Sequence, residues 1–170
     1  MIRDSLLAVS GRLDLAQGGS LVSWKNDEYA PEDNISASSS RRTVYLPIVR
    51  DRVYDALTIF DFANPSVGTS KRVPTVVSHQ ALFFLNSPLV KSSARALAQS
   101  LLEMESIGER GRIGLAYLQI FDRPPSADET ERVIRFLDSA KNSEAKDPNL
   151  AAWTALCQTL FAANEFIYRD

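Results

Sequence analysis

The amino-acid sequence predicts a mainly α-helical fold, a compact multi-helix domain with at most a short strand element. Apolar residues recur at intervals of three and four through most of the second half of the chain, which is the spacing of one face of a helix. Residues that start helices precede these stripes at Ser87-Pro88, Ser126 and Asp147-Pro148. The 170 residues are 45% hydrophobic and 24% charged, so the chain is long and apolar enough to form a buried core.

The first forty residues are predicted to be an N-terminal helix remnant followed by a flexible loop. Apolar residues at helical spacing mark the helix and Gly11 ends it; they are Ile2, Leu6, Leu7 and Val9. No cap precedes this helix, so we expect it to be the cut end of a longer domain. Residues 15–40 contain clusters of glycine, serine and polar residues that are typical of a loop.

Residues 41–170 are predicted to form the helical core domain, and its first elements are short. The β-branched and aromatic residues 43–46, stopped by Pro47, favour a short strand. Residues 53–60 have the pattern of a short amphipathic helix, and residues 64–74 that of a second loop. The apolar run 80–85 favours a buried helix, with a strand as the alternative at this length.

The remaining helices are predicted from their apolar stripes. One helix follows Ser87-Pro88, and its stripe consists of Leu89, Val90, Ala94, Leu97, Ala98, Leu101 and Leu102. The next helix carries the stripe Ile113, Ala116, Tyr117, Ile120 and Phe121. The last helix opens at Asp147-Pro148 and buries Trp153, Leu156, Cys157, Leu160 and Phe161.

Between these helices, Ser126 and Glu129 form a capping-box pattern that starts another helix. In a capping box, the hydroxyl and the carboxylate each accept a hydrogen bond from a free backbone N–H at the helix start. Val133, Ile134 and Leu137 of this helix are expected to face inward. Glu131 and Arg135 lie one turn apart and can pair on its surface.

Composition excludes several classes of protein. The chain has 19 basic and 21 acidic residues, and this net charge of −2 argues against a general binder of nucleic acid. A single cysteine excludes an intrachain disulfide. The N-terminus lacks the layout of a signal peptide, and no window approaches the roughly 20 apolar residues of a membrane span. We therefore expect this chain, as written, to be soluble, with its compartment unknown.

No catalytic residue is assigned from the sequence. His79, the only histidine, has the pKa range of a general base, but no supporting residues are visible, which favours a histidine at a helix start held by hydrogen bonds. Cys157 lies on an apolar stripe, where a buried thiol is inert packing. No cofactor is expected, because no phosphate-binding loop or Cys-x-x-Cys-His haem site is present.

No metal site is expected either. One histidine and one cysteine are too few for zinc without carboxylates. Calcium remains an alternative because residues 26–28 and 32–34 place oxygen donors in the first loop, although their spacing does not fit an EF-hand.

Positive charge is concentrated between residues 41 and 72. The weak candidates for ligand binding are Arg41, Arg42, Tyr45 and Arg50, since guanidinium groups beside an aromatic ring suit an acidic ligand or glycan. The structural alternative, which we favour, is pairing of these arginines with Asp51, Asp55 and Asp61.

Several short sequence segments, taken in order along the chain, resemble those of a planctomycete-type bacterial domain of unknown function. They are residues 9–13, 41–50, 60–62, 80–88, 123–129 and 164–168. The resemblance implies a place at the C-terminal end of large, exported or periplasmic proteins that carry cytochrome-c-like modules. It implies no activity, and this chain matches the C-terminal portion of that domain. Within the last segment, Asn164, Glu165 and Tyr168 are expected to cap and dock the final helix.

The sequence therefore favours a non-catalytic helical interaction and docking module of a larger bacterial protein. Its expected partners are other domains of that protein or cytochrome-c-like modules, with neither nucleic acid nor a membrane span. One alternative is a binding module for an acidic ligand or glycan at the arginine and tyrosine patch. Another is part of an enzyme that the missing domains complete.

Overall fold

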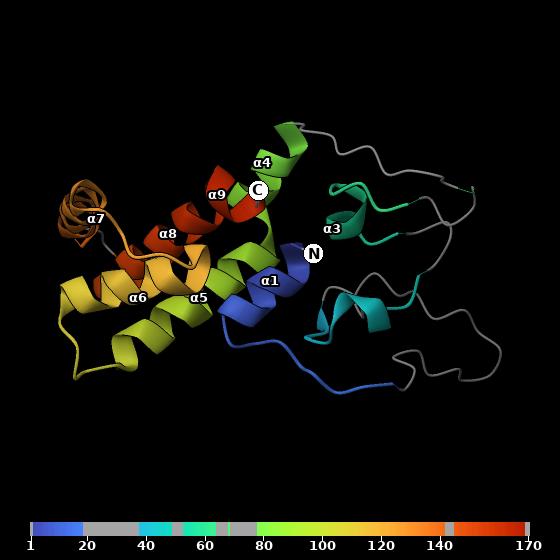
Figure 1. Ribbon diagram of the computed structural model, residues 1–170, viewed down its shortest axis with the longest axis horizontal. Coiled ribbons are helices and arrows are strands. Elements are labelled where there is room, and N and C mark those ends of the chain that lie inside the picture. Colours follow the sequence, from blue (N-terminus) through green and yellow to red (C-terminus); the bar gives the residue numbers. More distant parts are fainter. Residues whose placement is uncertain are drawn as a thin grey trace.

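The computed structural model describes residues 2–18, 38–48, 53–63, 68, 78–141 and 145–168. Helix α5 (Pro88–Glu103) lies at its centre and packs most extensively against α8 (Pro148–Phe161) (Figure 1). Helices α1 (Ile2–Val9), α4 (Ser78–Asn86) and α6 (Glu109–Phe121) also pack on α5. Because the described part of the chain contains helices and no strand, the prediction of a mainly α-helical fold is confirmed.

Two further helices complete this packing. Helix α7 (Ala127–Ala140) packs on α6 and α8, and the short α9 (Asn164–Ile167) lies against the same two helices. Two short elements, the 3-10 helix η1 (Thr43–Tyr45) and α3 (Asp55–Thr58), lie at one end of the group of helices, beside α1 and α4 (Figure 1).

A single cluster of buried side chains holds the helices together. Trp153, Phe84 and Phe161 are its largest fully buried members. The stripes predicted after Ser87 and Asp147 are buried in this cluster, apart from the half-buried Leu102. Leu6 and Leu7 of α1 belong to it as well. The proposed boundary between residues 40 and 41 stays a prediction, although α1 shares its core with the rest of the chain.

Most predicted helix ends are confirmed by their hydrogen bonds. Gly11 ends α1 with φ 67°, a left-handed conformation that glycine adopts without strain. Asp147 caps α8, because its Oδ1 accepts a hydrogen bond from Leu150 N at 3.0 Å. Ser126 and Glu129 form the predicted capping box at the start of α7, with both reciprocal hydrogen bonds present.

The predicted strand at residues 43–46 is wrong. Residues 43–45 form η1, in which Leu46 N donates to Thr43 O at 3.1 Å. Thr43 is held by α1, because its backbone N–H donates to Asp4 Oδ1 at 2.9 Å. Strand preference reflects pairing with a neighbouring strand. Within the described residues the only pairing of this kind is one isolated bridge between Asp14 and Arg41.

Two further expectations need correction. Residues 80–85 do form a helix, α4, but Leu82 and Leu85 are 51% and 56% exposed, so only one side of it is buried. On α7, the carboxylate of Glu131 accepts from Arg110 at 2.7 Å instead of pairing with Arg135. Arg135 Nε reaches only the backbone oxygen of Glu131, at 3.4 Å.

Candidate functional site

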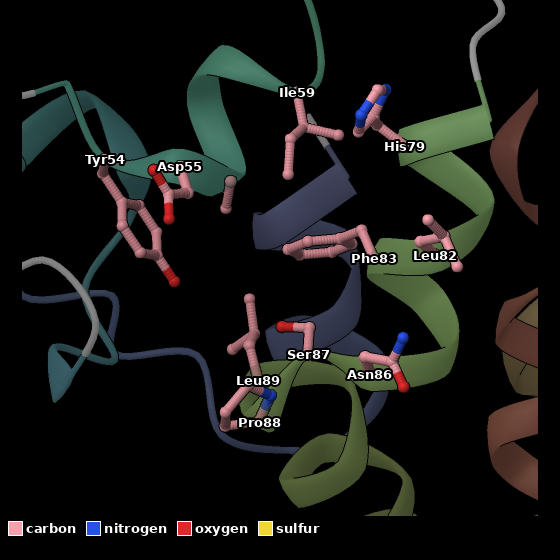
Figure 2. A pocket seen from close by; sticks show the side chains of 11 residues that line it. Tyr54, Asp55, Ile59, His79, Leu82, Phe83, Asn86, Ser87, Pro88 and Leu89 are labelled. Carbon is pink, nitrogen blue, oxygen red and sulfur yellow. The ribbon is translucent and has the colours of Figure 1, made fainter.

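A cleft opens where α4 meets α5, opposite the short helix α3. Its volume is about 460 Å³, within the range of small-molecule and peptide pockets. Figure 2 shows side chains from α3 and its preceding residue on one side and side chains from α4 on the other, with the start of α5 below them. We call this the α3–α4 cleft.

The apolar wall of the cleft is firmly supported. Its members are Ala56, Ile59, Leu82, Phe83, Pro88 and Leu89. The ring of Phe83 lies edge-on to Phe60 at 5.3 Å and to Phe84 at 5.7 Å between centroids. Edge-to-face contacts of this kind fix ring orientation beyond simple burial. The wall therefore has a preformed shape.

Five polar side chains also line the cleft: Tyr54, Asp55, His79, Asn86 and Ser87. Within the described residues, none of the five side chains is hydrogen-bonded or ion-paired to the protein. Ser87 shows this most clearly, since it occupies the N-cap position of α5 without accepting a helix N–H. Five polar groups that converge on a cleft without protein partners are available to a ligand.

The charge of the lining is negative. Asp55 is the only carboxylate among the lining residues, and no lysine or arginine is among them. Burial raises the pKa of Tyr54; Asp55 adds to this effect, whereas the positive charge of Arg3 opposes it. Tyr54 is therefore neutral at physiological pH and can donate or accept a hydrogen bond. The cleft suits an occupant that combines an apolar group with a cation.

The cleft lacks the arrangement of a nucleophilic enzyme. A serine or cysteine nucleophile is activated by a hydrogen-bonded base. No hydrogen bond joins Ser87 to His79 in the described structure. His79 is the second residue of α4 and exposed, so it lies at a helix start as expected, but without the expected hydrogen bonds among the described residues.

Cys157 is buried on α8, and burial raises the pKa of its thiol to about 12. The expectation that Cys157 is packing is confirmed, because a thiol with this pKa stays protonated.

The sequence-predicted patch lies outside the cleft. The Arg41 guanidinium lies 5.9 Å from the centroid of the Tyr45 ring, so the aromatic and cationic pair is present. Arg41 Nε also lies 3.9 Å from Asp14 Oδ2. Arg42 is exposed, and Arg50 lies outside the described residues. The structure thus brings Arg41 and Tyr45 together; binding by this patch stays a prediction.

Arg3 was missed by sequence reasoning. It is 2% exposed and donates to Arg41 O at 2.8 Å, to Thr43 Oγ1 at 3.3 Å and to the backbone oxygen of Ser39. The position of Arg3 among the apolar residues of the first helix could have indicated this role. A guanidinium buried at such a position requires hydrogen-bond acceptors. Through these bonds Arg3 ties the segment before α3 to α1.

We also searched the described part of the chain for clusters of metal ligands and for helices that could cross a membrane. No group of three or more histidine, cysteine, aspartate or glutamate side chains converges there. The calcium candidates at residues 26–28 and 32–34 lie outside the described residues. None of the described helices is long and apolar enough to cross a bilayer.

Comparison with known protein families gives a match over most of the chain. A family model described as PSD1, protein of unknown function (DUF1553), matches residues 1–137, which is more than half of the chain. The matched part includes residues 123–129 but not residues 164–168, whose resemblance stays a prediction. No curated protein and no solved structure matches the chain significantly.

Proposed function

The chain belongs to the PSD1 family of proteins of unknown function (DUF1553), and from this premise we propose that it is a non-catalytic docking module of a larger bacterial protein. The observation that carries the proposal is the α3–α4 cleft, in which five polar side chains without partners among the described residues line a preformed apolar wall. The sequence resemblance supports a planctomycete-type protein in which this module lies near the C-terminus.

The exposed side of α4 extends the docking surface. Leu82 and Leu85 are 51% and 56% exposed and lie three residues apart, so they occupy the same side of the helix. Leu82 also lines the cleft. Because about half of each side chain is already buried, covering each leucine stabilises a complex by about 0.8–1.5 kcal/mol. We define the docking face as the α3–α4 cleft together with Leu82 and Leu85.

The chemistry of the docking face selects its occupant. Asp55 contributes a negative charge, and no lining residue contributes a fixed positive one. An unpaired carboxylate beside an apolar wall favours a lysine or arginine next to a large apolar residue. The occupant we propose is therefore a basic, apolar segment of a neighbouring domain in the same protein, such as a cytochrome-c-like module.

Binding between separated parts of the protein tests this proposal. Another domain of the full-length protein, such as a cytochrome-c-like module, is produced separately, and its affinity for this chain is measured by calorimetry. Leu82→Ser and Asp55→Asn are each expected to weaken binding roughly tenfold. Leu118→Ser is the matched control, because Leu118 on α6 is 50% exposed and lies outside the docking face. The absence of measurable binding, or equal affinities for all variants, overturns the proposal.

A second candidate is binding of an acidic glycan at Arg41, Arg42, Tyr45 and Arg50. The observation that favours it is the Arg41 guanidinium over the Tyr45 ring, beside an exposed Arg42 without a partner among the described residues. Sulfated and uronic glycans should then raise the melting temperature, and salt should abolish the effect. An Arg42→Gln variant that responds as the wild type does would exclude this site.

A further inference from the structure

A second groove lies on another part of the molecule, between α6, α7 and α8. Its main lining residues are Tyr117, Arg132, Val133, Phe136, Leu156 and Leu160, and its volume is about 290 Å³. This volume is just below the roughly 300–1,000 Å³ typical of ligand pockets, so only a small ligand fits. None of these residues lines the α3–α4 cleft.

The apolar part of the groove includes an aromatic side chain that the fold leaves uncovered. Phe136 is 37% exposed, whereas Val133, Leu156 and Leu160 on the groove floor are 3–7% exposed. Phe136 lies one turn after Arg132 on α7, so the two side chains are neighbours on the helix surface. An exposed aromatic ring and a guanidinium therefore flank the same apolar floor.

The groove is lined by one carboxylate, Glu129, and one guanidinium, Arg132. Both carboxylate oxygens of Glu129 accept from Arg123, at 2.8 and 2.9 Å, and one accepts from Ser126 N at 2.7 Å. Arg132 has no hydrogen-bond or ion-pair partner among the described residues. Because Glu129 is held by Arg123, the Arg132 guanidinium has no direct carboxylate partner among the described residues and is open to a ligand.

Tyr117 supplies a second polar group. The residue is 5% exposed and lines the groove, yet its hydroxyl makes no hydrogen bond within the described structure. Among the described residues, Arg3 Nε is the only buried side-chain nitrogen or oxygen without a partner, so the Tyr117 hydroxyl keeps accessible surface in the groove. The free hydroxyl of Tyr117 and the free guanidinium of Arg132 are both donors suited to an anion.

We propose that this groove binds a small carboxylate with a short apolar tail. Arg132 pairs with the carboxylate, Tyr117 donates a hydrogen bond to it, and the tail lies along Phe136 and the floor. A planar guanidinium can bind a carboxylate through two parallel hydrogen bonds, which makes arginine the preferred partner. This site is independent of the docking face, so either proposal can fail without the other.

Octanoate titrated into the full chain tests the site, with binding followed by amide chemical shifts. Saturable shifts are expected at Val133, Thr159 and Leu160. Octan-1-ol and octylammonium, which keep the tail and change the head group, should bind at least tenfold more weakly. Arg132→Gln should weaken octanoate binding by about 10- to 100-fold, from the loss of a hydrogen-bonded charge.

Two variants refine the result. Tyr117→Phe should weaken octanoate binding up to about tenfold, because it removes one hydrogen bond and keeps the ring. Arg135→Gln is the control, since Arg135 is exposed on the same helix and lies outside the groove. The spectrum of each variant reports whether it is folded. Octanol binding as tightly as octanoate, an Arg132→Gln variant with wild-type affinity, or the absence of saturable shifts overturns the proposal.

Discussion

Arg123 and Glu165 form a two-bond ion pair across 42 residues of sequence. Arg123 Nε donates to Glu165 Oε1 at 2.6 Å, and Nη2 donates to Oε2 at 2.8 Å. The same guanidinium donates two bonds to Glu129, at 2.8 and 2.9 Å. One arginine therefore joins the start of α7, where Glu129 completes the capping box, to α9 at the end of the fold.

Two aromatic rings also lie beside the Arg123 guanidinium. The guanidinium lies 5.7 Å from the centroids of both Tyr117 and Phe121, which come from the last two turns of α6. Cation–π contact and bidentate pairing restrict the side chain to one geometry. Glu165 therefore docks the final helix as expected, and Tyr168 adds a bond from its hydroxyl to Gln80 Oε1 at 3.4 Å.

Replacement of Arg123 by lysine should lower the melting temperature. Lysine keeps the charge but cannot pair with two carboxylates through parallel bonds. Arg110→Lys is the control, because Arg110 makes a single exposed bond to Glu131, and such pairs contribute little. Calorimetry of the two variants should show the larger loss for Arg123→Lys. Equal decreases in melting temperature would mean that the two-carboxylate geometry of Arg123 does not contribute to stability.

The Arg123 pair should also make stability depend on pH. Hydrogen bonding by Arg123 and then by the Ser126 backbone lowers the pKa of Glu129 from 4.5 to about 2. Because the folded-state pKa is the lower one, this contribution is complete above about pH 4.5 and is lost as the pH falls toward 2. Urea unfolding of wild type and Glu129→Gln should therefore differ at pH 6 and converge near pH 2. Glutamine can still accept the capping-box bond through its amide oxygen but loses the charge and one of the two bonds from Arg123, so the difference reports the whole pair.

Two N-cap positions should respond differently to alanine. Asp147→Ala should lower the free energy of unfolding by about 1 kcal/mol, since Asp147 accepts from Leu150 N. Ser87→Ala should be nearly neutral, because the Ser87 hydroxyl makes no cap bond. Urea titrations of both variants provide the comparison. A Ser87→Ala loss as large as that of Asp147→Ala would show that the hydroxyl serves the helix and is not free for the cleft.

The elements predicted correctly from the sequence are those fixed by local interactions. The capping box at Ser126 and the stripe around Trp153 depend on residues within one or two turns, so their spacing alone identifies them. The error at residues 43–46 has the opposite origin. Thr43 is held by Asp4, which lies 39 residues away, and no local pattern reports that contact.

Most of the candidate site could not be predicted from the sequence either, because it depends on contacts between segments that are distant along the chain. The cleft combines Tyr54 and Asp55, near α3, with His79 and Ser87, near the two ends of α4. These residues acquire a shared role only when α3 comes to lie opposite α4. Sequence reasoning considered Asp55 only as a partner for arginines. The break between α4 and α5 at Ser87-Pro88 was the one visible sign of where a cleft forms.

Cys157 should resist thiol reagents while the chain is folded. Its side chain, on α8, is fully buried in the hydrophobic core, and burial raises the pKa of the thiol to about 12. Thiol reagents attack the thiolate, so labelling requires the thiol both to reach solvent and to ionise. The rate of labelling with a disulfide reagent should therefore follow global unfolding and rise in urea in proportion to the unfolded fraction. Fast labelling in native buffer would mean that α8 opens locally, and the core described for α5 and α8 would then be less cooperative than its burial indicates.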